Sequence, residues 1–95
     1  MLKRTKIAAL LASDAPQEQV LLKGWVRTRR DAKDFSFIEV NDGSCLKNMQ
    51  IIANNTLKNY EDIKKLSTGS SVAVTGALTE SKGGSQKFEV VADSI

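Results

Sequence analysis

Two kinds of hydrophobic spacing divide the chain into a short helical start and a long extended remainder. Ile7 and Leu10 recur at helical spacing, and Thr5 is placed to cap a helix that runs through about Ala12. From Val20 onward, hydrophobic and polar side chains alternate with a period of two, which is typical of a β-strand with one buried face. The pattern therefore predicts one N-terminal helix followed by β-structure.

The first predicted strand is long and carries a glycine, Gly24, in its middle. Glycine inside a strand commonly marks a bulge or a sharp bend. A long strand bent at a glycine can serve both sheets of a small barrel. Val20, Leu22 and Val26 share one face of this strand, and we expect Trp25 on the other face to pack between the barrel and the N-terminal helix.

The rest of the chain predicts four more strands and one more helix. Turn residues separate them, most clearly the run NDGS at residues 41–44, which is a strong hairpin signal. The predicted strands are Phe35–Val40, Leu46–Ile52, Val72–Leu78 and Phe88–Ala92, with a helix at about residues 58–66 and a flexible hairpin loop at Lys82–Ser85. Five strands with a helix between the third and fourth is the order of the OB-fold, so we expect an all-β, five-stranded Greek-key barrel.

Composition limits the classes of function that this chain can have. Its 95 residues fit one domain, with residues 1–16 as the helix and connector and residues 20–95 as the barrel. The chain has no histidine and only one cysteine, Cys45, so we expect no catalytic residue, no metal site and no internal disulfide. No apolar run approaches the roughly 20 residues of a membrane-spanning helix. We therefore expect a cytoplasmic protein without a membrane partner, and the net charge of +3 allows a polyanionic partner without requiring one.

The outward positions of the predicted strands carry chemistry suited to single-stranded nucleic acid. By alternation, Phe37, Gln50 and Glu89 point outward from the second, third and fifth strands. An aromatic ring can stack under a base while basic side chains follow the phosphate backbone. Solvated strand residues are the alternative for each position, and Phe37 could instead pack under the loop at Lys33. The cations near these strands are Arg27, Arg29, Arg30 and Lys33.

Five segments of the chain resemble a known family along nearly its whole length. GWVRTRRD, SFIEVNDGS, NMQII, VAVTGAL and QKFEVVA are similar to the N-terminal anticodon-binding domain of bacterial-type asparaginyl-tRNA synthetases. The broad pattern is shared by the aspartate, asparagine and lysine enzymes of class II. The pair Arg27-Thr28 after GWV and the NDGS turn favour the asparagine enzymes.

The resemblance implies a partner and a role for individual residues. It implies that the chain binds the GUU anticodon loop of the asparagine tRNA. Phe37 would then stack on the middle base, and Gln50 and Arg30 would contact the edge of that base. Glu89 would read the guanine at the first position. We expect Arg27, Arg29 and Lys33 to bind phosphates, which supplies affinity rather than specificity.

The resemblance does not extend to the catalytic half of those enzymes. ATP and Mg²⁺ are used there, so we expect neither enzyme activity nor a cofactor from these 95 residues alone. An excised domain or truncated product is expected, whose parent enzyme has a catalytic domain and forms a homodimer. Two alternatives remain: an aspartate-type anticodon domain and a generic single-strand-binding OB domain. Generic domains usually spread several aromatics along a groove, and only Phe35 and Phe37 are available here.

Overall fold

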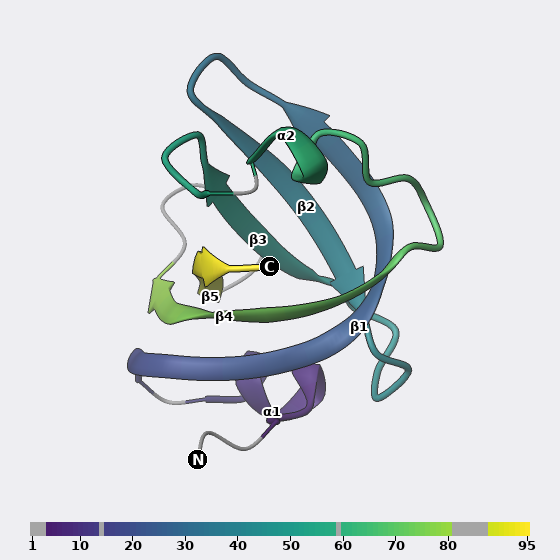
Figure 1. Ribbon diagram of the computed structural model, residues 1–95. Helices are drawn as coiled ribbons and strands as arrows, with labels where there is room; N and C mark the ends of the chain where they lie inside the picture. Colours follow the sequence, from purple (N-terminus) through teal and green to yellow (C-terminus); the bar gives the residue numbers. More distant parts are fainter. Residues whose placement is uncertain (1–3, 14, 59, 81–87) are drawn as a thin grey trace.

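The structure is a computed structural model that describes residues 4–13, 15–58, 60–80 and 88–95. Its elements follow in the order α1 (Ile7–Leu11), β1 (Gln17–Asp31), β2 (Phe35–Asn41), β3 (Met49–Asn54), α2 (Tyr60–Ile63), β4 (Ser71–Glu80) and β5 (Phe88–Ser94). The strands close into a barrel in the order β1-β2-β3-β5-β4 (Figure 1). Only the β3–β5 pair is parallel among these neighbours. The predicted five-stranded OB barrel is confirmed, while the predicted loop at Lys82–Ser85 lies outside the described residues.

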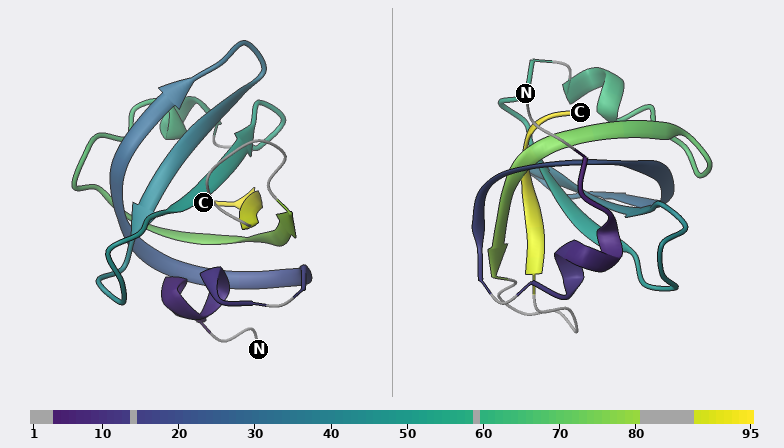
Figure 2. Two further views of the ribbon diagram at one scale, coloured as in Figure 1. Left: turned by 180° about the vertical axis from the view of Figure 1, so that it is seen from behind. Right: turned by 90° about the horizontal axis from the view of Figure 1, so that it is seen from below.

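Strand β1 pairs with two neighbours, and the change from one to the other falls next to Gly24. Residues 17–25 pair with β4, and residues 25–31 pair with β2. A Cβ atom at Gly24 would collide with the backbone carbonyl of Asn41, so the close approach of the two strands requires a residue without a side chain. The predicted use of one long strand by both sheets is confirmed, and β1 can be followed as it curves around the barrel in Figure 2.

The core is built from the alternating side chains of all five strands, as the sequence pattern predicts. Strand β2 alternates regularly, with Ile38 and Val40 buried between half-buried neighbours. Both helices add to the core, because Ile7 and Leu10 of α1 and Ile63 of α2 are buried. The other buried hydrophobic residues are Val20, Leu22, Val26, Met49, Ile51, Ala53, Val74, Leu78, Phe88, Val90 and Ala92.

Helix α1 is capped by the loop between β2 and β3 rather than by its own sequence. The backbone N–H of Ile7 donates to Asp42 Oδ2 at 2.9 Å, and that of Ala8 donates to Ser44 Oγ at 3.0 Å. The predicted cap at Thr5 is wrong, because the helix begins at Ile7 and its cap position is Lys6, whereas the backbone N–H of Thr5 donates to the carbonyl of Leu21 in β1. The loop therefore satisfies the free N–H groups that begin the helix.

Two element boundaries differ from the sequence prediction for local reasons. Strand β3 begins at Met49 instead of Leu46, because the Asn41 side chain donates to the loop carbonyls of Cys45 and Lys47. Leu46 is therefore fully exposed in the loop instead of packing in a strand. Helix α2 is a single turn, and the residues that follow it tighten into hydrogen bonds three residues apart, which ends the α-helix.

Candidate nucleic-acid interface

The side chains that point away from the core on β1, β2, β3 and β5 form one surface, here termed the outward face. Arg30 opposes Phe37 across the β1–β2 ladder, and Glu39 opposes Gln50 across the β2–β3 ladder. Ile51 pairs with Val90 on β5, so the preceding residues Gln50 and Glu89 also lie side by side. Opposed residues on neighbouring strands point to the same face. The outward face is therefore defined by Arg30, Phe37, Glu39, Gln50 and Glu89.

A bulge in β1 decides which arginines reach the outward face. The β1–β2 register shifts between Val26 and Thr28, which inserts one extra residue into β1. After the shift, Arg30 opposes Phe37, whereas Arg29 opposes the buried Ile38. Since a shift of one residue exchanges the two faces of a strand, Arg30 points outward and Arg29 points toward the barrel end.

Arg29 is consequently engaged within the protein. Its Nε donates to the carbonyl of Leu66 at 2.9 Å, and its Nη1 forms an ion pair with Asp31 at 2.6 Å. The Arg29 guanidinium, followed by a hydrogen bond from the hydroxyl of Ser36, holds the pKa of Asp31 below its ordinary value. The structure therefore does not bring Arg29 together with the other predicted site residues.

The Phe37 ring is held from two sides at one end of the outward face. The guanidinium carbon of Arg30 lies 4.8 Å from the centre of the ring, within the range of a cation–π contact. The ring of Phe35 meets Phe37 edge-on, with 4.9 Å between centroids and an angle of 83°. Phe37 is nonetheless only partly buried. These contacts fix the orientation of the ring while part of it remains open to a ligand.

Gln50 and Glu89 stand together in the middle of the outward face. The amide nitrogen of Gln50 lies 3.5 Å from Glu89 Oε2, at the long limit of a hydrogen bond. The predicted alternation holds at Glu89, but its side chain is not the solvated one that the sequence indicates, because the residue is only 7% exposed. Thr79 on β4 flanks Glu89 on one side and Gln50 flanks it on the other. A partly desolvated carboxylate of this kind is a strong hydrogen-bond acceptor.

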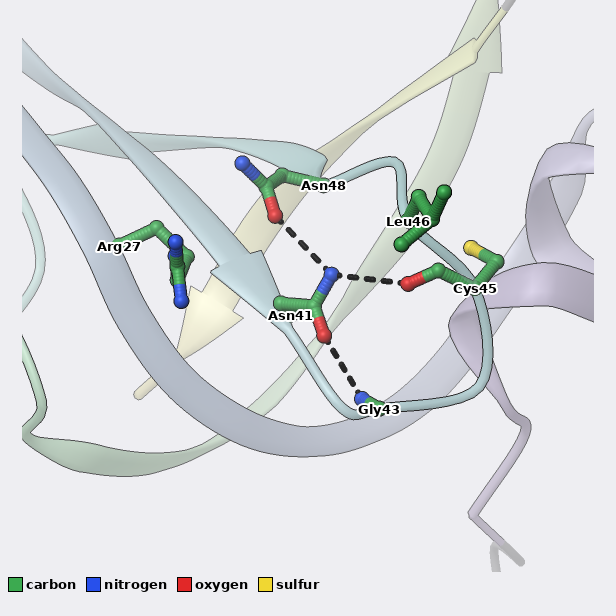
Figure 3. A pocket seen from close by; sticks show the side chains of 6 residues that line it. All are labelled: Arg27, Asn41, Gly43, Cys45, Leu46 and Asn48. Atoms are coloured by element: carbon green, nitrogen blue, oxygen red, sulfur yellow. Dashed lines mark hydrogen bonds between the residues drawn. The ribbon is translucent and has the colours of Figure 1, made fainter.

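Three polar residues that the sequence did not single out extend this group toward the loop between β2 and β3. Asn48 donates from its amide nitrogen to Glu39 Oε2 at 3.2 Å, and its Oδ1 accepts from Asn41 Nδ2 at 3.1 Å (Figure 3). Asn41 also binds loop backbone groups, including the N–H of Gly43. Alternation along the sequence does place Glu39 and Asn48 among the outward residues. Only the pairing of the strands in the structure shows that their side chains meet.

Arg27 and Lys33 are both exposed, and Arg27 is the extra residue of the bulge in β1. Lys33 lies in the turn that joins β1 to β2. Arg27 lines a pocket of about 390 Å³ (Figure 3). Trp25 opposes Asn41 beside this pocket and is 40% exposed, instead of being enclosed between the barrel and α1. The other residues that line the pocket are Asn41, Gly43, Cys45, Leu46 and Asn48.

The described part of the structure contains neither a metal-binding group nor a membrane-spanning helix. In those segments, no three His, Cys, Asp or Glu side chains gather in a group that could hold a metal ion. No helix there is long and apolar enough to cross a membrane.

Known proteins resemble this chain in sequence. Residues 20–95 match the family model of the OB-fold nucleic acid binding domain. The asparagine–tRNA ligase of Geotalea uraniireducens is 45% identical over 95 residues, which is 100% of this chain and 21% of that protein. The asparagine–tRNA ligase of Desulfotalea psychrophila is 55% identical over 93 residues, which is 97% of this chain and 21% of that protein. The chain thus spans about a fifth of the length of these curated relatives.

Solved structures share the fold at lower identity. The crystal structure of asparaginyl-tRNA synthetase from Pyrococcus horikoshii complexed with asparaginyl-adenylate matches with a TM-score of 0.83 and 24% identity, over 99% of this chain and 22% of that chain. The OBody AM3L09 bound to hen egg-white lysozyme matches with a TM-score of 0.80 and 15% identity, over 99% of this chain and 93% of that chain. At these identities the likeness shows the OB barrel alone.

Proposed function

The chain belongs to the anticodon-binding type of OB-fold nucleic acid binding domains, and from this premise we propose that its outward face binds the GUU anticodon loop of an asparagine tRNA. One observation carries the proposal. An aromatic ring with a cation against it, an amide and a carboxylate come from four different strands and stand on one face. Stacking, base-edge recognition and acceptance from guanine each require one of these groups.

Phe37 supplies the stacking surface in this proposal. Every base has a flat face, so an aromatic ring binds a splayed base without selecting which base it is. The Arg30 guanidinium lies over the ring in the free protein, so in this proposal it moves aside when a base stacks there and donates to the edge of that base. The middle base of the loop is therefore held by its face at Phe37 and contacted at its edge by Arg30.

Gln50 supplies selectivity for the middle uridine. Its amide nitrogen is turned toward Glu89, which leaves its Oε1 available as an acceptor. The N3–H of uracil is a donor, whereas the N3 of cytosine is an acceptor. An oriented Gln50 amide therefore favours uracil over cytosine at this position, and Glu89 contributes by fixing the amide.

Glu89 supplies selectivity for the first base. A carboxylate offers only acceptors when it is ionised. Guanine presents two donors at its N1–H and N2–H₂ groups, and these become accessible when the base is unpaired. Adenine presents an acceptor at N1, which faces a carboxylate unfavourably. The buried setting of Glu89 raises the cost of leaving its acceptors unmatched.

The phosphate contacts that we propose fall on two exposed cations, Arg27 at the bulge of β1 and Lys33 in the turn between β1 and β2. Arg29 is left out, because its guanidinium is bound by Asp31 and by the carbonyl of Leu66. Contacts of this kind supply affinity and position the RNA without reading its sequence.

Aminoacylation itself belongs to the rest of such an enzyme in this proposal. The chain spans about a fifth of its relatives, so ATP and Mg²⁺ chemistry would be carried out by a catalytic domain outside these residues. That catalytic domain and its homodimeric parent are the partners that we propose besides the tRNA, in the cytoplasm. The role of this chain is to bind and orient the anticodon loop.

A comparison of three RNAs tests the proposed function. The ligands are an anticodon stem-loop carrying GUU, the same stem-loop carrying GUC, and an unstructured oligonucleotide of equal length and base composition. We expect the GUU stem-loop to bind more tightly than the unstructured oligonucleotide and no more weakly than the GUC stem-loop, because Phe37, Gln50 and Glu89 contact only the first two bases. A preference for GUC would instead assign the domain to the aspartate type. Equal binding of the unstructured oligonucleotide would assign it to generic single-strand binding.

A further inference from the structure

We propose that Trp25, Arg27 and Leu46 form a second nucleotide subsite, which takes a further unpaired nucleotide of the same RNA. The base stacks on the Trp25 indole, the phosphate binds the Arg27 guanidinium, and Leu46 flanks the sugar. This inference rests on the proposed function, because it extends the RNA path beyond the residues that read the anticodon.

The apolar part of the subsite is unusual for this surface. Trp25 and Leu46 are the two large hydrophobic side chains that the described part of the chain leaves exposed, at 40% and about 100%. Both border the pocket of about 390 Å³: Leu46 lines it, and Trp25 opposes Asn41 and reaches Gly43, which line it too. Exposed apolar groups that are rimmed by polar ones mark interaction sites.

The polar part of the subsite is preformed. The Asn41 amide donates to the carbonyl of Cys45 and to the side chain of Asn48 (Figure 3), and also to the carbonyl of Lys47, so the loop wall is held in place. The Arg27 guanidinium has neither an ion pair nor a hydrogen bond to any described residue, and only the backbone carbonyl of Arg27 accepts one, from Thr68. An exposed cation beside a rigid pocket is suited to an anionic ligand.

The pocket adjoins the outward face, and for this reason we assign RNA as its ligand. Asn48 lines the pocket and also donates to Glu39, which opposes Gln50 in the β2–β3 ladder. The pocket is thus joined to the residues that we propose read the middle and first bases. An aromatic ring next to a cation along one groove is the arrangement by which OB-folds hold successive nucleotides. A protein segment would use the apolar groups but would leave the Arg27 charge unmatched unless it carried an acidic residue.

The chain has a single tryptophan, so its fluorescence reports on Trp25 alone. The experiment titrates the GUU stem-loop, with a dye on the RNA stem to follow binding independently. We expect RNA to change the emission of Trp25 and to protect it from quenching by acrylamide. Trp25→Leu should weaken binding by on the order of tenfold, the equivalent of one lost base stack, while Trp25→Phe should retain most of the affinity.

Charge is tested by a matched pair on the same strand. Arg27→Gln should weaken stem-loop binding more than Lys23→Gln, because Arg27 lines the pocket and the exposed Lys23 does not. If the dye reports binding while Trp25 emission and acrylamide quenching stay unchanged, the subsite is refuted. The exposed Trp25 and Leu46 would then be assigned to a contact with a protein. That decision needs only the wild-type chain, so it holds even if a variant fails to fold. If the stem-loop does not bind at all, the proposed function fails first and the subsite with it.

Discussion

Phe37 is the residue whose contribution to binding is easiest to isolate. Its ring is fixed by Arg30 and Phe35 but remains only partly buried. We predict that Phe37→Ala weakens stem-loop binding by about 1–3 kcal/mol, the range for one base stacked on one aromatic ring. The loss should be nearly the same whether the middle base is U or C, because stacking does not read the base edge. Calorimetric titration of both stem-loops measures it.

A loss confined to the U stem-loop would contradict this account of Phe37, because it would assign base reading to the ring. Gln50→Ala is the matched comparison on the same face. It should lower binding to the U stem-loop and reduce the discrimination against C, since the amide is proposed to read the edge of the base.

Arg27 and Arg29 are neighbours in sequence with opposite expected behaviour. Arg27 is exposed and unpaired among the described residues, whereas Arg29 is held by Asp31 and by the carbonyl of Leu66. We predict that Arg27→Gln makes the slope of log K against log salt shallower by roughly 0.7, the value for one phosphate contact on a single strand. Arg29→Gln should leave this slope unchanged.

Fluorescence titrations at several salt concentrations measure both slopes. Equal changes for the two variants would show that Arg29 leaves Asp31 to bind RNA. Thermal unfolding provides the complementary readout, because Arg29→Gln removes internal contacts and should lower the melting temperature, while Arg27→Gln should not.

The arginines also show where sequence reasoning reaches its limit. Regular alternation places residues 25, 27 and 29 on one face of β1, but the bulge after Val26 exchanges the faces from Thr28 onward. Arg30 reaches Phe37 for that reason, and Arg29 does not. No residue pattern in the sequence marks this bulge. The burial of Glu89 could not be predicted from the sequence for a similar reason, since it depends on neighbours from β3 and β4 that no local pattern specifies.

At the scale of elements, the strands were predictable and their ends were not. Alternation identified the five strands, and Gly24 lies next to the residue where β1 changes partner from β4 to β2. Strand β3 begins later than predicted because the Asn41 side chain donates hydrogen bonds to carbonyls of the preceding loop. The start of α1 shifted because its cap comes from the loop between β2 and β3, about 35 residues away in sequence. Both boundaries depend on contacts that lie outside the element itself.

The cap of α1 gives a prediction about stability and pH. Burial alone would raise the pKa of Asp42, but hydrogen bonds from Ser44 and from the backbone N–H of Ile7 outweigh it and lower the pKa below the ordinary 3.8. A carboxyl whose pKa is lowered by folding stabilises the protein above its unfolded pKa, and this contribution is lost as pH falls through the folded value. We predict that Asp42→Ala lowers the free energy of unfolding by about 1 kcal/mol at neutral pH.

The difference in free energy of unfolding between wild type and Asp42→Ala should begin to shrink as pH falls below about 4, where the unfolded carboxyl becomes protonated, and should vanish only below the lowered pKa of folded Asp42, where both proteins lack the ionised cap. Urea unfolding at pH 7 and at pH 3 measures it. Asp34→Ala is the control, since Asp34 is exposed in the turn between β1 and β2 and should change stability little at either pH. A difference for Asp42→Ala that persists undiminished at low pH would contradict the assignment.

At the scale of the whole molecule, the closed barrel brings residues 30, 37, 50 and 89 onto one surface, although they are spread over most of the chain. Alternation and family resemblance together were sufficient to name these positions. Neither could show the spatial order along the outward face, which depends on strand register. That register also adds Glu39 and Asn48 to the surface and joins it to the pocket at Arg27.

The central claim is that this surface reads an anticodon whose first base is guanine, and Glu89 gives the most direct test. Stem-loops with G or A at the first position are titrated against wild type, Glu89→Gln and Glu39→Gln, which loses the same charge from the same face. Wild type and Glu39→Gln should prefer G by about tenfold or more, the worth of hydrogen bonds to a charged acceptor. Glu89→Gln should lose that preference and bind the G stem-loop more weakly, although removing a negative charge would otherwise favour RNA binding. A wild type without preference for G, or a Glu89→Gln variant that keeps it, would contradict the claim.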